Sequence, residues 1–295
     1  MSGFVQQHHT VDAFVSSDSW VILSEIEQSI KHKIERVGTP LKDWDIQINY
    51  GLKTGYNDAF IIKSDVRERI LANCQTEDER KRTAEIIRPI LRGRDIKKYG
   101  YDWADLWLIW VPWHFPLHFD ESIQGASEIA EDTFRREYPS VYAHLSLYKK
   151  QLSARNKAET GIRYEWYALQ RWGAKYWDDF SKPKIVYPET TQGAYFAFDD
   201  KGLFIDKTCF MLISDEAQYL QHTLSSRLFE FAYKNIFSSI ELGEHGYQYN
   251  KHALVKLPVL KCSDSSILND VQDIDEKIYT LYDISEDEIR FIESR

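Results

Sequence analysis

Cysteine is scarce in this sequence, and the pattern of its cysteines argues against two kinds of site. The chain has three, and no two form a C-x-x-C pair: Cys74, Cys209 and Cys262. An odd and dispersed set is not that of a disulfide framework or of a zinc site. His114 and His118 are four residues apart, but Pro116 between them interrupts the helix that would align them as ligands. We therefore predict no metal site.

Long hydrophobic runs are also missing. No apolar segment approaches the roughly 18 residues that a membrane-spanning helix requires. The first residues, Met1 to Val5, lack the charged-then-apolar pattern of a secretory signal. We therefore expect a soluble, cytoplasmic protein without a membrane partner.

The common catalytic motifs are absent as well. The sequence contains no G-x-S-x-G, no G-x-x-x-x-G-K-[ST] and no G-x-G-x-x-G. It also lacks Asn/Asp-Pro-Pro-Tyr, which holds the exocyclic amine in amino-methyltransferases. A metal-dependent nuclease would need clustered carboxylates beside a lysine on a strand. Asp199-Asp200 and Asp206-Lys207 come nearest, and hairpin-turn chemistry explains both more simply. We therefore expect no catalytic residue and no cofactor in this chain.

What the chain does have is the composition of a globular protein and an uneven distribution of charge. Its 295 residues are 43% hydrophobic and 14% aromatic, and the formal net charge is −9. Lys and Arg outnumber Asp and Glu by 12 to 8 over residues 50–100 and by 9 to 4 over residues 142–184. Over residues 264–295 they are outnumbered, 3 to 10. Affinity for nucleic acid depends on the local field, so the two basic stretches could form one binding surface.

The hydrophobic pattern alternates between helical and extended periods. We expect helices over residues 21–37, 65–73, 77–86, 128–152 (broken near Pro139) and 217–237, and two acidic helices at the end. We expect strands 45–50 and 59–62 paired across a 53–57 turn, a central strand 106–111, a strand 184–187, and a meander of strands 194–198, 203–205 and 208–213.

These elements predict an α/β (α+β) fold, a mixed β-sheet body with helical insertions and a C-terminal helical piece. The expected divisions are a helical lead-in (1–40), a central domain (41–260) and acidic C-terminal helices (261–295).

The first candidate binding segment is Gly51 to Phe60. Gly55 and Asn57 are residue types that tolerate positive φ, and such turns leave backbone N–H groups free to meet an anion. Lys53 and Thr54 could then reach a phosphate. The alternative is an ordinary hairpin turn in which Asn57 caps its own backbone.

The second candidate segment follows Pro89, which prevents a helix through its arginines. Gly93 allows close backbone approach, and guanidinium forks suit phosphate oxygens or the edge of guanine. Asp95 could orient one arginine through a bidentate pair. The candidate contacts here are Arg88, Arg92, Gly93 and Arg94. The alternative is a structural Arg–Asp salt bridge at a sheet edge.

A third segment interleaves basic groups with rings, as in proteins that bind a nucleic-acid backbone and unstacked bases. Its candidate contacts are Lys149, Arg155, Trp166 and Arg171. Lysines that extend over a packed helix would give the same pattern.

An ordered set of segments resembles a known family. The segments are Gly51-Leu-Lys-Thr-Gly-Tyr-Asn-Asp-Ala-Phe60, Ile87-Arg-Pro-Ile-Leu-Arg-Gly-Arg-Asp-Ile96, Trp107-Leu-Ile109, Tyr138-Pro139, Leu152-x-x-Arg155, Trp166-Tyr167, Lys184-Ile-Val-Tyr-Pro188, Lys256-Leu-Pro258 and the ending from Ile274 to Ile289. The set resembles the TaqI-like C-terminal specificity domain. That domain is the target-recognition region of type IIG restriction–modification enzymes and related adenine-specific DNA methyltransferases.

The resemblance implies a double-stranded DNA partner and adds Lys184 to the candidate contacts. It also implies a methylase domain or subunit upstream, which would hold S-adenosylmethionine, and in some members a nuclease. Neither is expected within this sequence.

Three hypotheses follow. In the first, the chain recognises a DNA sequence. In the second, it completes a DNA methyltransferase in trans. In the third, it is a protein-interaction module whose acidic tail docks on a partner while the arginines brace the fold.

Overall fold

The computed structural model describes residues 23–237, 241–242, 246–262 and 273–295. Two parts of the expected divisions lie outside the described residues. They are residues 1–22 of the lead-in and residues 263–272 of the C-terminal piece. The longer helices are α2 (Glu25–Val37), α4 (Ser64–Ala72), α5 (Glu77–Ile86), α6 (Glu128–Glu137), α7 (Pro139–Ser146), α9 (Ala217–Ser225), α12 (Ile274–Leu281) and α13 (Glu286–Glu293). The shorter ones are α3 (Asn57–Phe60), α8 (Lys149–Ala154), α10 (Arg227–Ala232) and α11 (Lys251–Leu254), with one-turn helices η1 (Leu41–Asp43), η2 (Gly93–Asp95), η3 (Trp177–Ser181) and η4 (Tyr233–Phe237).

Two four-stranded sheets form the body, so the α/β prediction is confirmed. The first has the order β10 (Ala197–Asp199), β8 (Lys184–Pro188), β12 (Cys209–Ile213) and β2 (Gln47–Tyr50), all antiparallel. The second has the order β11 (Phe204–Ile205), β4 (Ile87–Leu91), β7 (Leu106–Ile109) and β3 (Ile61–Lys63). Small sheets join β1 (Thr39–Pro40) to β15 (Pro258–Val259), β5 (Ile96–Lys97) to β6 (Gly100–Tyr101), and β9 (Thr190–Thr191) to β14 (Gly246–Gln248) and β13 (Glu241–Leu242).

The first sheet separates two hydrophobic cores. Along β8, Val186 packs in one core, while Ile185 and Tyr187 pack in the other. Because successive side chains of a strand point to opposite faces, a strand covered on both sides is buried at almost every position, as β8 and β12 are. Their side chains are apolar or aromatic apart from Lys184 at the start of β8.

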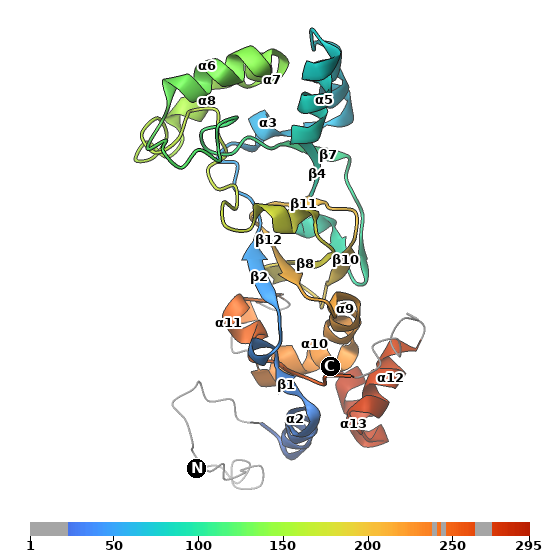
Figure 1. Cartoon of the computed structure of the whole chain (residues 1–295). Coiled ribbons are helices and arrows are strands. Elements are labelled where there is room, and N and C mark those ends of the chain that lie inside the picture. The colour runs from blue at the N-terminus through green and yellow to red at the C-terminus, as the bar shows by residue number, and fades with distance from the viewer. Residues whose placement is uncertain (1–22, 238–240, 243–245, 263–272) are drawn as a thin grey trace.

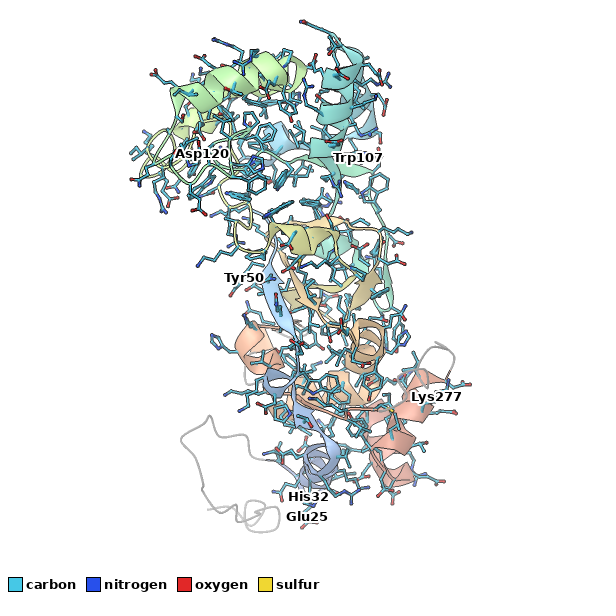
Figure 2. The ribbon with its side chains drawn as sticks, in the orientation of Figure 1. Glu25, His32, Tyr50, Trp107, Asp120 and Lys277 are labelled. Atoms are coloured by element: carbon cyan, nitrogen blue, oxygen red, sulfur yellow. The ribbon has the colours of Figure 1, made fainter. Side chains whose placement is uncertain are left out.

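The molecule is elongated along the line through these cores. The second sheet and helices α3 to α8 lie at one end, and α2 and α9 to α13 lie at the other (Figure 1). Tyr50 lies near the middle of this axis, between Trp107 and Asp120 towards one end and His32 at the other (Figure 2).

The first and last helices that the structure describes, α2 and α13, meet at the lower end. Ser24 forms a capping box with Glu27 at the start of α2, and Ile30 and Ile34 of that helix are buried. The carboxylate of Glu288 on α13 accepts from Lys33 and Ser29 of α2, at 2.7 Å each. No helix in the described part of the chain is long and apolar enough to cross a membrane.

Two predicted strand pairings were wrong. Strand β2 does not pair with residues 59–62: it pairs with β12, while β3 pairs with β7 in the other sheet. The predicted meander is also divided, because β11 runs parallel to β4 and leaves β10 and β12 on either side of β8. Local periodicity identifies a strand but not the strand it pairs with, because long-range packing decides the pairing.

Candidate nucleic-acid interface

A groove of about 970 Å³ brings four distant segments together. It is lined by Asn57, Arg92, Gly93, Arg94, Ile96, Lys97, Pro188, Glu189, Thr190, Thr191, Gln192, Tyr195, Asp206, Lys207 and Thr208. Four of these side chains are cationic and two are acidic, so the groove is positive although the whole chain is negative. It contains four of the residues that the sequence predicts as contacts: Asn57, Arg92, Gly93 and Arg94.

The arginine wall of the groove is a rigid turn between β4 and β5. The Asp95 carboxylate accepts from the backbone N–H of Arg92 at 2.9 Å, from its Nε at 2.9 Å and from its Nη2 at 2.8 Å. Burial would raise the pKa of Asp95, but these hydrogen bonds hold the pKa below its ordinary value. The bidentate pair expected from the sequence is present.

The other side of the turn is held by the start of β12. The backbone N–H of Gly93 donates to Thr208 Oγ1 at 2.9 Å. A Cβ at Gly93 would approach that oxygen to 3.1 Å and Pro188 Cβ to 3.2 Å. Glycine therefore allows the turn to pack closely against β8 and β12, as predicted for this position.

Two cations in the groove are free to meet an anion. Arg94 and Lys207 are exposed, and neither side chain has a hydrogen bond or an ion pair with any residue that the structure describes. Lys97 is also exposed, and its Nζ donates to the carbonyl oxygen of Arg94 at 2.9 Å, which leaves its charge uncompensated. Exposed, unpaired cations of this kind suit phosphate oxygens.

The facing wall is a polar loop after β8. The backbone N–H of Glu189 donates to the carbonyl oxygen of Thr208 at 2.9 Å, and the Glu189 carbonyl accepts from Tyr249 N at 3.0 Å. Thr190 and Thr191 pair with β14. These backbone bonds fix the loop, while Glu189, Thr190 and Gln192 contribute side chains that accept or donate hydrogen bonds.

Sequence reasoning missed this loop and Lys207. Turn chemistry accounts for Asp206, whose Oδ1 accepts from Thr208 N at 2.9 Å, but it does not account for the exposed Lys207. The overlooked signal was the polar run Glu189 to Gln192 between Pro188 and Gly193, directly after a strand that is buried along its whole length.

The first predicted segment contributes one groove residue and a tight turn. Gly55 has a φ of +78°, whereas Asn57 has helical backbone and begins α3, so only the glycine uses the positive φ that both residue types tolerate. Thr54 is buried, and its Oγ1 donates to Asn57 Oδ1 at 2.5 Å. Lys53 is half-buried and pairs through its backbone with Arg171, 2.9 Å in each direction.

Arg155 is a structural residue, which corrects its prediction as a nucleic-acid contact. It is 9% exposed, and its guanidinium donates to the carbonyl oxygens of Thr54, Trp166 and Ala168. Burial lowers its pKa to about 10. Trp166 is corrected in the same way, because it is buried and its Nε1 donates to Glu131 at 2.7 Å.

Two further predicted contacts remain accessible but lie outside the groove lining. Lys149 is 3.6 Å from the Glu131 carboxylate and 4.7 Å from the centre of the Trp166 ring. These contacts fit the alternative stated for the third segment, in which the lysine extends over a packed helical surface. Arg171 is exposed, donates to Gly51 O at 2.9 Å and lies 5.4 Å from the centre of the exposed Tyr50 ring.

Lys184 is buried completely, so its prediction as a DNA contact is also corrected. Its Nζ lies 2.6 Å from the Asp199 carboxylate, and both side chains have no exposed surface. Burial lowers the pKa of Lys184, Asp199 opposes that shift, and nearby Arg88 adds to it. Arg88 itself is half-buried, 5.4 Å from the centre of the Phe204 ring, and is not a lining residue of the groove.

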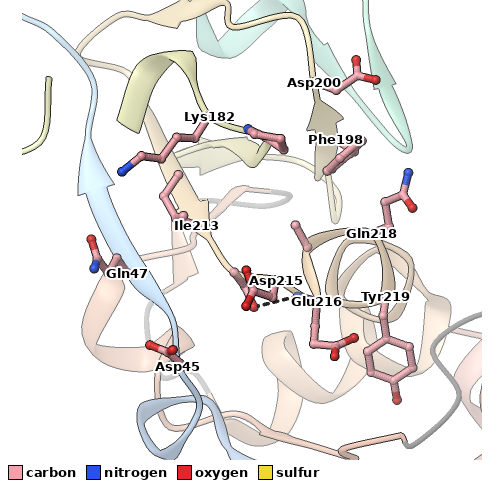
Figure 3. A pocket seen from close by; sticks show the side chains of 13 residues that line it. Asp45, Gln47, Lys182, Phe198, Asp200, Ile213, Asp215, Glu216, Gln218 and Tyr219 are labelled. Atoms are coloured by element: carbon pink, nitrogen blue, oxygen red, sulfur yellow. Dashed lines mark hydrogen bonds between the residues drawn. The ribbon is translucent and has the colours of Figure 1, made fainter. Parts of the chain in front are cut away.

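A second cavity, of about 700 Å³, has the opposite electrostatic character. Asp45, Asp200, Asp215 and Glu216 line it between the start of α9 and strand β2 (Figure 3). The lining has four carboxylates and one cationic side chain, Lys182, which is itself paired with Asp178 and Asp179. This cavity is therefore unsuited to a phosphate backbone. Among the described residues, no group of three or more His, Cys, Asp or Glu could hold a metal ion.

The fold and groove thus define a mixed α/β module with a preformed cationic groove. The family model of the TaqI-like C-terminal specificity domain matches residues 88–259, which includes the arginine turn, the polar loop and Lys207. The chain belongs to this family, and the resemblance inferred from the sequence is confirmed.

Individual relatives cover different shares of this chain. The chain is 28% identical over 100 residues to the type II methyltransferase M.BanIII of Aneurinibacillus aneurinilyticus, covering 34% of this chain and 16% of that protein. The type IIL restriction–modification enzyme MmeI, solved in complex with DNA, aligns at 15% identity and a TM-score of 0.48, covering 87% of this chain and 36% of its own. The type IIG restriction endonuclease BpuSI aligns at 14% identity and a TM-score of 0.48, covering 86% and 28%. The chain therefore spans only a minor part of each of these proteins.

Proposed function

We propose that this chain recognises a specific sequence in double-stranded DNA, as the specificity domain of an adenine-specific DNA methyltransferase of a restriction–modification system in the cytoplasm. The observation that carries the proposal is the cationic groove, which lies almost entirely within the family-matched segment. Its Arg94 and Lys207 side chains have no hydrogen bond or ion pair with the residues that the structure describes. A duplex is a polyanion, and unpaired cations release its counterions on binding.

The two walls of the groove have different roles in this proposal. Arg94, Lys97 and Lys207 hold the sugar–phosphate backbone and fix the register of the duplex. Glu189 and Gln192 on the polar loop have the chemistry to distinguish base edges, since Glu accepts from cytosine N4 and Gln pairs with adenine N6 and N7. Asn57 also lines the groove. Lys53 and Arg171 are paired next to the Leu52–Asp206 bridge, and Asp206 is a lining residue, so these two cations extend the basic surface.

Catalysis is assigned elsewhere in this proposal. A methylase domain or subunit upstream would hold S-adenosylmethionine and the target adenine, while this chain positions the duplex. The relative M.BanIII is a methyltransferase of which the matched segment covers 16%, which supports a division between recognition and chemistry.

The direct test is a selection of binding sites from a random duplex library, followed by affinity measurements across a range of salt concentrations. We expect one enriched sequence. In the double variant Arg94→Ala/Lys207→Ala, the slope of log K against log salt concentration should be smaller by the equivalent of about two phosphate contacts. The matched control is Lys42→Ala/Lys277→Ala, which removes the same charge from two residues that do not line the groove. Lys277 lies towards the lower end of the molecule (Figure 2). An unchanged slope in the groove variant would overturn the assignment of the groove.

The alternative functions give different results in the same experiments. If the chain completes a methyltransferase in trans, adenine methylation appears only when it is mixed with a separate methylase protein. A protein-interaction module is favoured by the Arg92–Asp95 ion pair, which can brace the fold, and by the acidic cavity of Figure 3. That function predicts no enriched duplex sequence.

A further inference from the structure

Asp95 binds one edge of the Arg92 guanidinium, and the other edge has no hydrogen bond to any residue that the structure describes. Its Nε and Nη2 donate to the two carboxylate oxygens of Asp95, at 2.9 and 2.8 Å. That side-on pair uses one N–H of each nitrogen. The second N–H of Nη2 and both of Nη1 remain, and one N–H from each Nη nitrogen forms a parallel end-on fork.

The fork is fixed in space before any ligand binds. Asp95 also accepts from the backbone N–H of Arg92, and the N–H of Gly93 donates to Thr208 in the turn before β12. The Arg92 side chain is 24% exposed and lines the groove, whereas Asp95 lies behind it at 5%. An arginine whose rotamer is already fixed loses little entropy on binding, which favours a contact of exact geometry.

Arg94, two residues away, has the opposite properties. Its side chain is exposed and has no partner in the described structure, so it can follow a phosphate as a mobile charge. Phosphate contacts tolerate variation in position, whereas reading a base requires a fixed donor pair. A parallel N–H fork matches the O6 and N7 acceptors of guanine in the major groove.

We propose that Arg92, positioned by Asp95, reads one guanine of the recognised duplex through its end-on fork, and that Asp95 is a positioning residue for this contact. The inference rests on the proposed DNA-recognition function and names a base that the target must contain. Arg92 is then a determinant of specificity, and Arg94 is a determinant of affinity.

The experiment uses the 295-residue chain and the duplex enriched from the random library. Each guanine of that duplex is replaced in turn by 7-deazaguanine, which removes N7 and keeps Watson–Crick pairing. We expect one position to weaken wild-type binding by about 5-fold or more. Arg92→Lys keeps the charge and the pair with Asp95 but loses the fork, so it should bind the unmodified duplex about 10-fold more weakly and show no further loss at that guanine.

Two other variants separate positioning from charge. Asp95→Asn should reduce the ratio of specific to non-specific affinity while the salt slope stays unchanged, because Arg92 keeps its charge but loses its orientation. Arg94→Gln should reduce the salt slope by about one phosphate equivalent and leave the guanine profile of the wild type intact. Circular dichroism and thermal melts check that each variant is folded.

The outcomes separate this inference from the proposed function. Enrichment of no duplex overturns the proposed function itself. An enriched site without guanine, or an Arg92→Lys protein that keeps the wild-type penalty at every 7-deazaguanine, overturns the inference alone. The inference is also overturned if a neutral methylphosphonate at one linkage weakens binding of the wild type but not of Arg92→Lys. Arg92 would then contact a phosphate and not a base.

Discussion

Arg155 donates a guanidinium hydrogen bond to the carbonyl oxygen of Thr54, which lies 101 residues earlier in the chain. The same guanidinium bonds to Trp166 O at 3.0 Å and to Ala168 O. One buried cation therefore joins the turn beside the groove to a segment that has no regular secondary structure around residues 160–171.

The first prediction concerns this residue. Arg155→Lys keeps a positive charge but cannot reach three carbonyl groups in the same plane, so buried acceptors lose their donors. We expect the free energy of unfolding to fall by about 2–4 kcal/mol, measured by urea denaturation. Arg163→Ala removes an exposed arginine paired with Glu159, and should change stability by less than about 0.5 kcal/mol. Equal effects of the two variants would contradict the structural role of Arg155.

The second prediction concerns the turn that Arg155 supports. Gly55 has a φ of +78°, and an added Cβ would lie 2.9 Å from Arg155 Cδ. Gly55→Ala should therefore destabilise the protein by about 1–2 kcal/mol, through strained backbone and this contact. Gly100 has an open environment, and Gly100→Ala is the control for a general effect of removing glycine. The measurement is the midpoint of thermal unfolding for the two variants.

The third prediction tests the buried pair of Lys184 and Asp199. Lys184→Met leaves the Asp199 carboxylate buried without its cation, which should cost about 3–5 kcal/mol. The double variant Lys184→Met/Asp199→Asn should recover part of that loss, because the uncompensated charge is gone. Chemical denaturation of the wild type, the two single variants Lys184→Met and Asp199→Asn, and the double variant gives the coupling energy. If Lys184→Met proved neutral in stability yet abolished binding to the enriched duplex, its assignment as a structural residue would be wrong.

The fourth prediction is a dependence on pH. Burial would raise the pKa of Glu288, but hydrogen bonds from Lys33, Ser285 and Ser29 lower it below its ordinary value. The stabilisation is therefore present above the ordinary carboxyl pKa and is lost as the pH falls through the lowered one. Glu288→Gln should cost about 1–3 kcal/mol near pH 7 and less near pH 3.

The control for this pH dependence is Glu286→Gln, because the Glu286 side chain is 91% exposed. Its unfolding free energy should follow the wild type at both pH values. A pH-independent cost of Glu288→Gln would show that packing, and not the carboxylate charge, joins α13 to α2.

Local signals predicted the helices well. Isoleucines at every fourth position place α2, and Ser285 with Glu288 marks the start of α13, because capping and amphipathic periodicity are encoded within one helix. Strand β8 was also predicted at its observed position. The pairing of β2 with β12 could not be predicted in this way, since the partners are separated by about 160 residues and the pairing depends on which cores they share.

The candidate site was predicted in part for the same reason. Arg92 and Asp95 are three residues apart with Gly93 between them, so their bidentate pair could be predicted from the local sequence. Lys184 and Arg155 have the same charge as Arg94, and sequence does not distinguish a cation that faces solvent from one enclosed by carbonyls or a carboxylate. Burial decides that difference, and burial is a property of the assembled chain.

The two walls of the groove are anchored in different cores: the arginine turn lies between Leu91 and Ile96 of one, while the 189–192 loop follows Tyr187 of the other. An occupant that touched both walls would make local unfolding of either half more costly. Amide protons at the two ends of the molecule would then exchange more slowly together, even where nothing touches them.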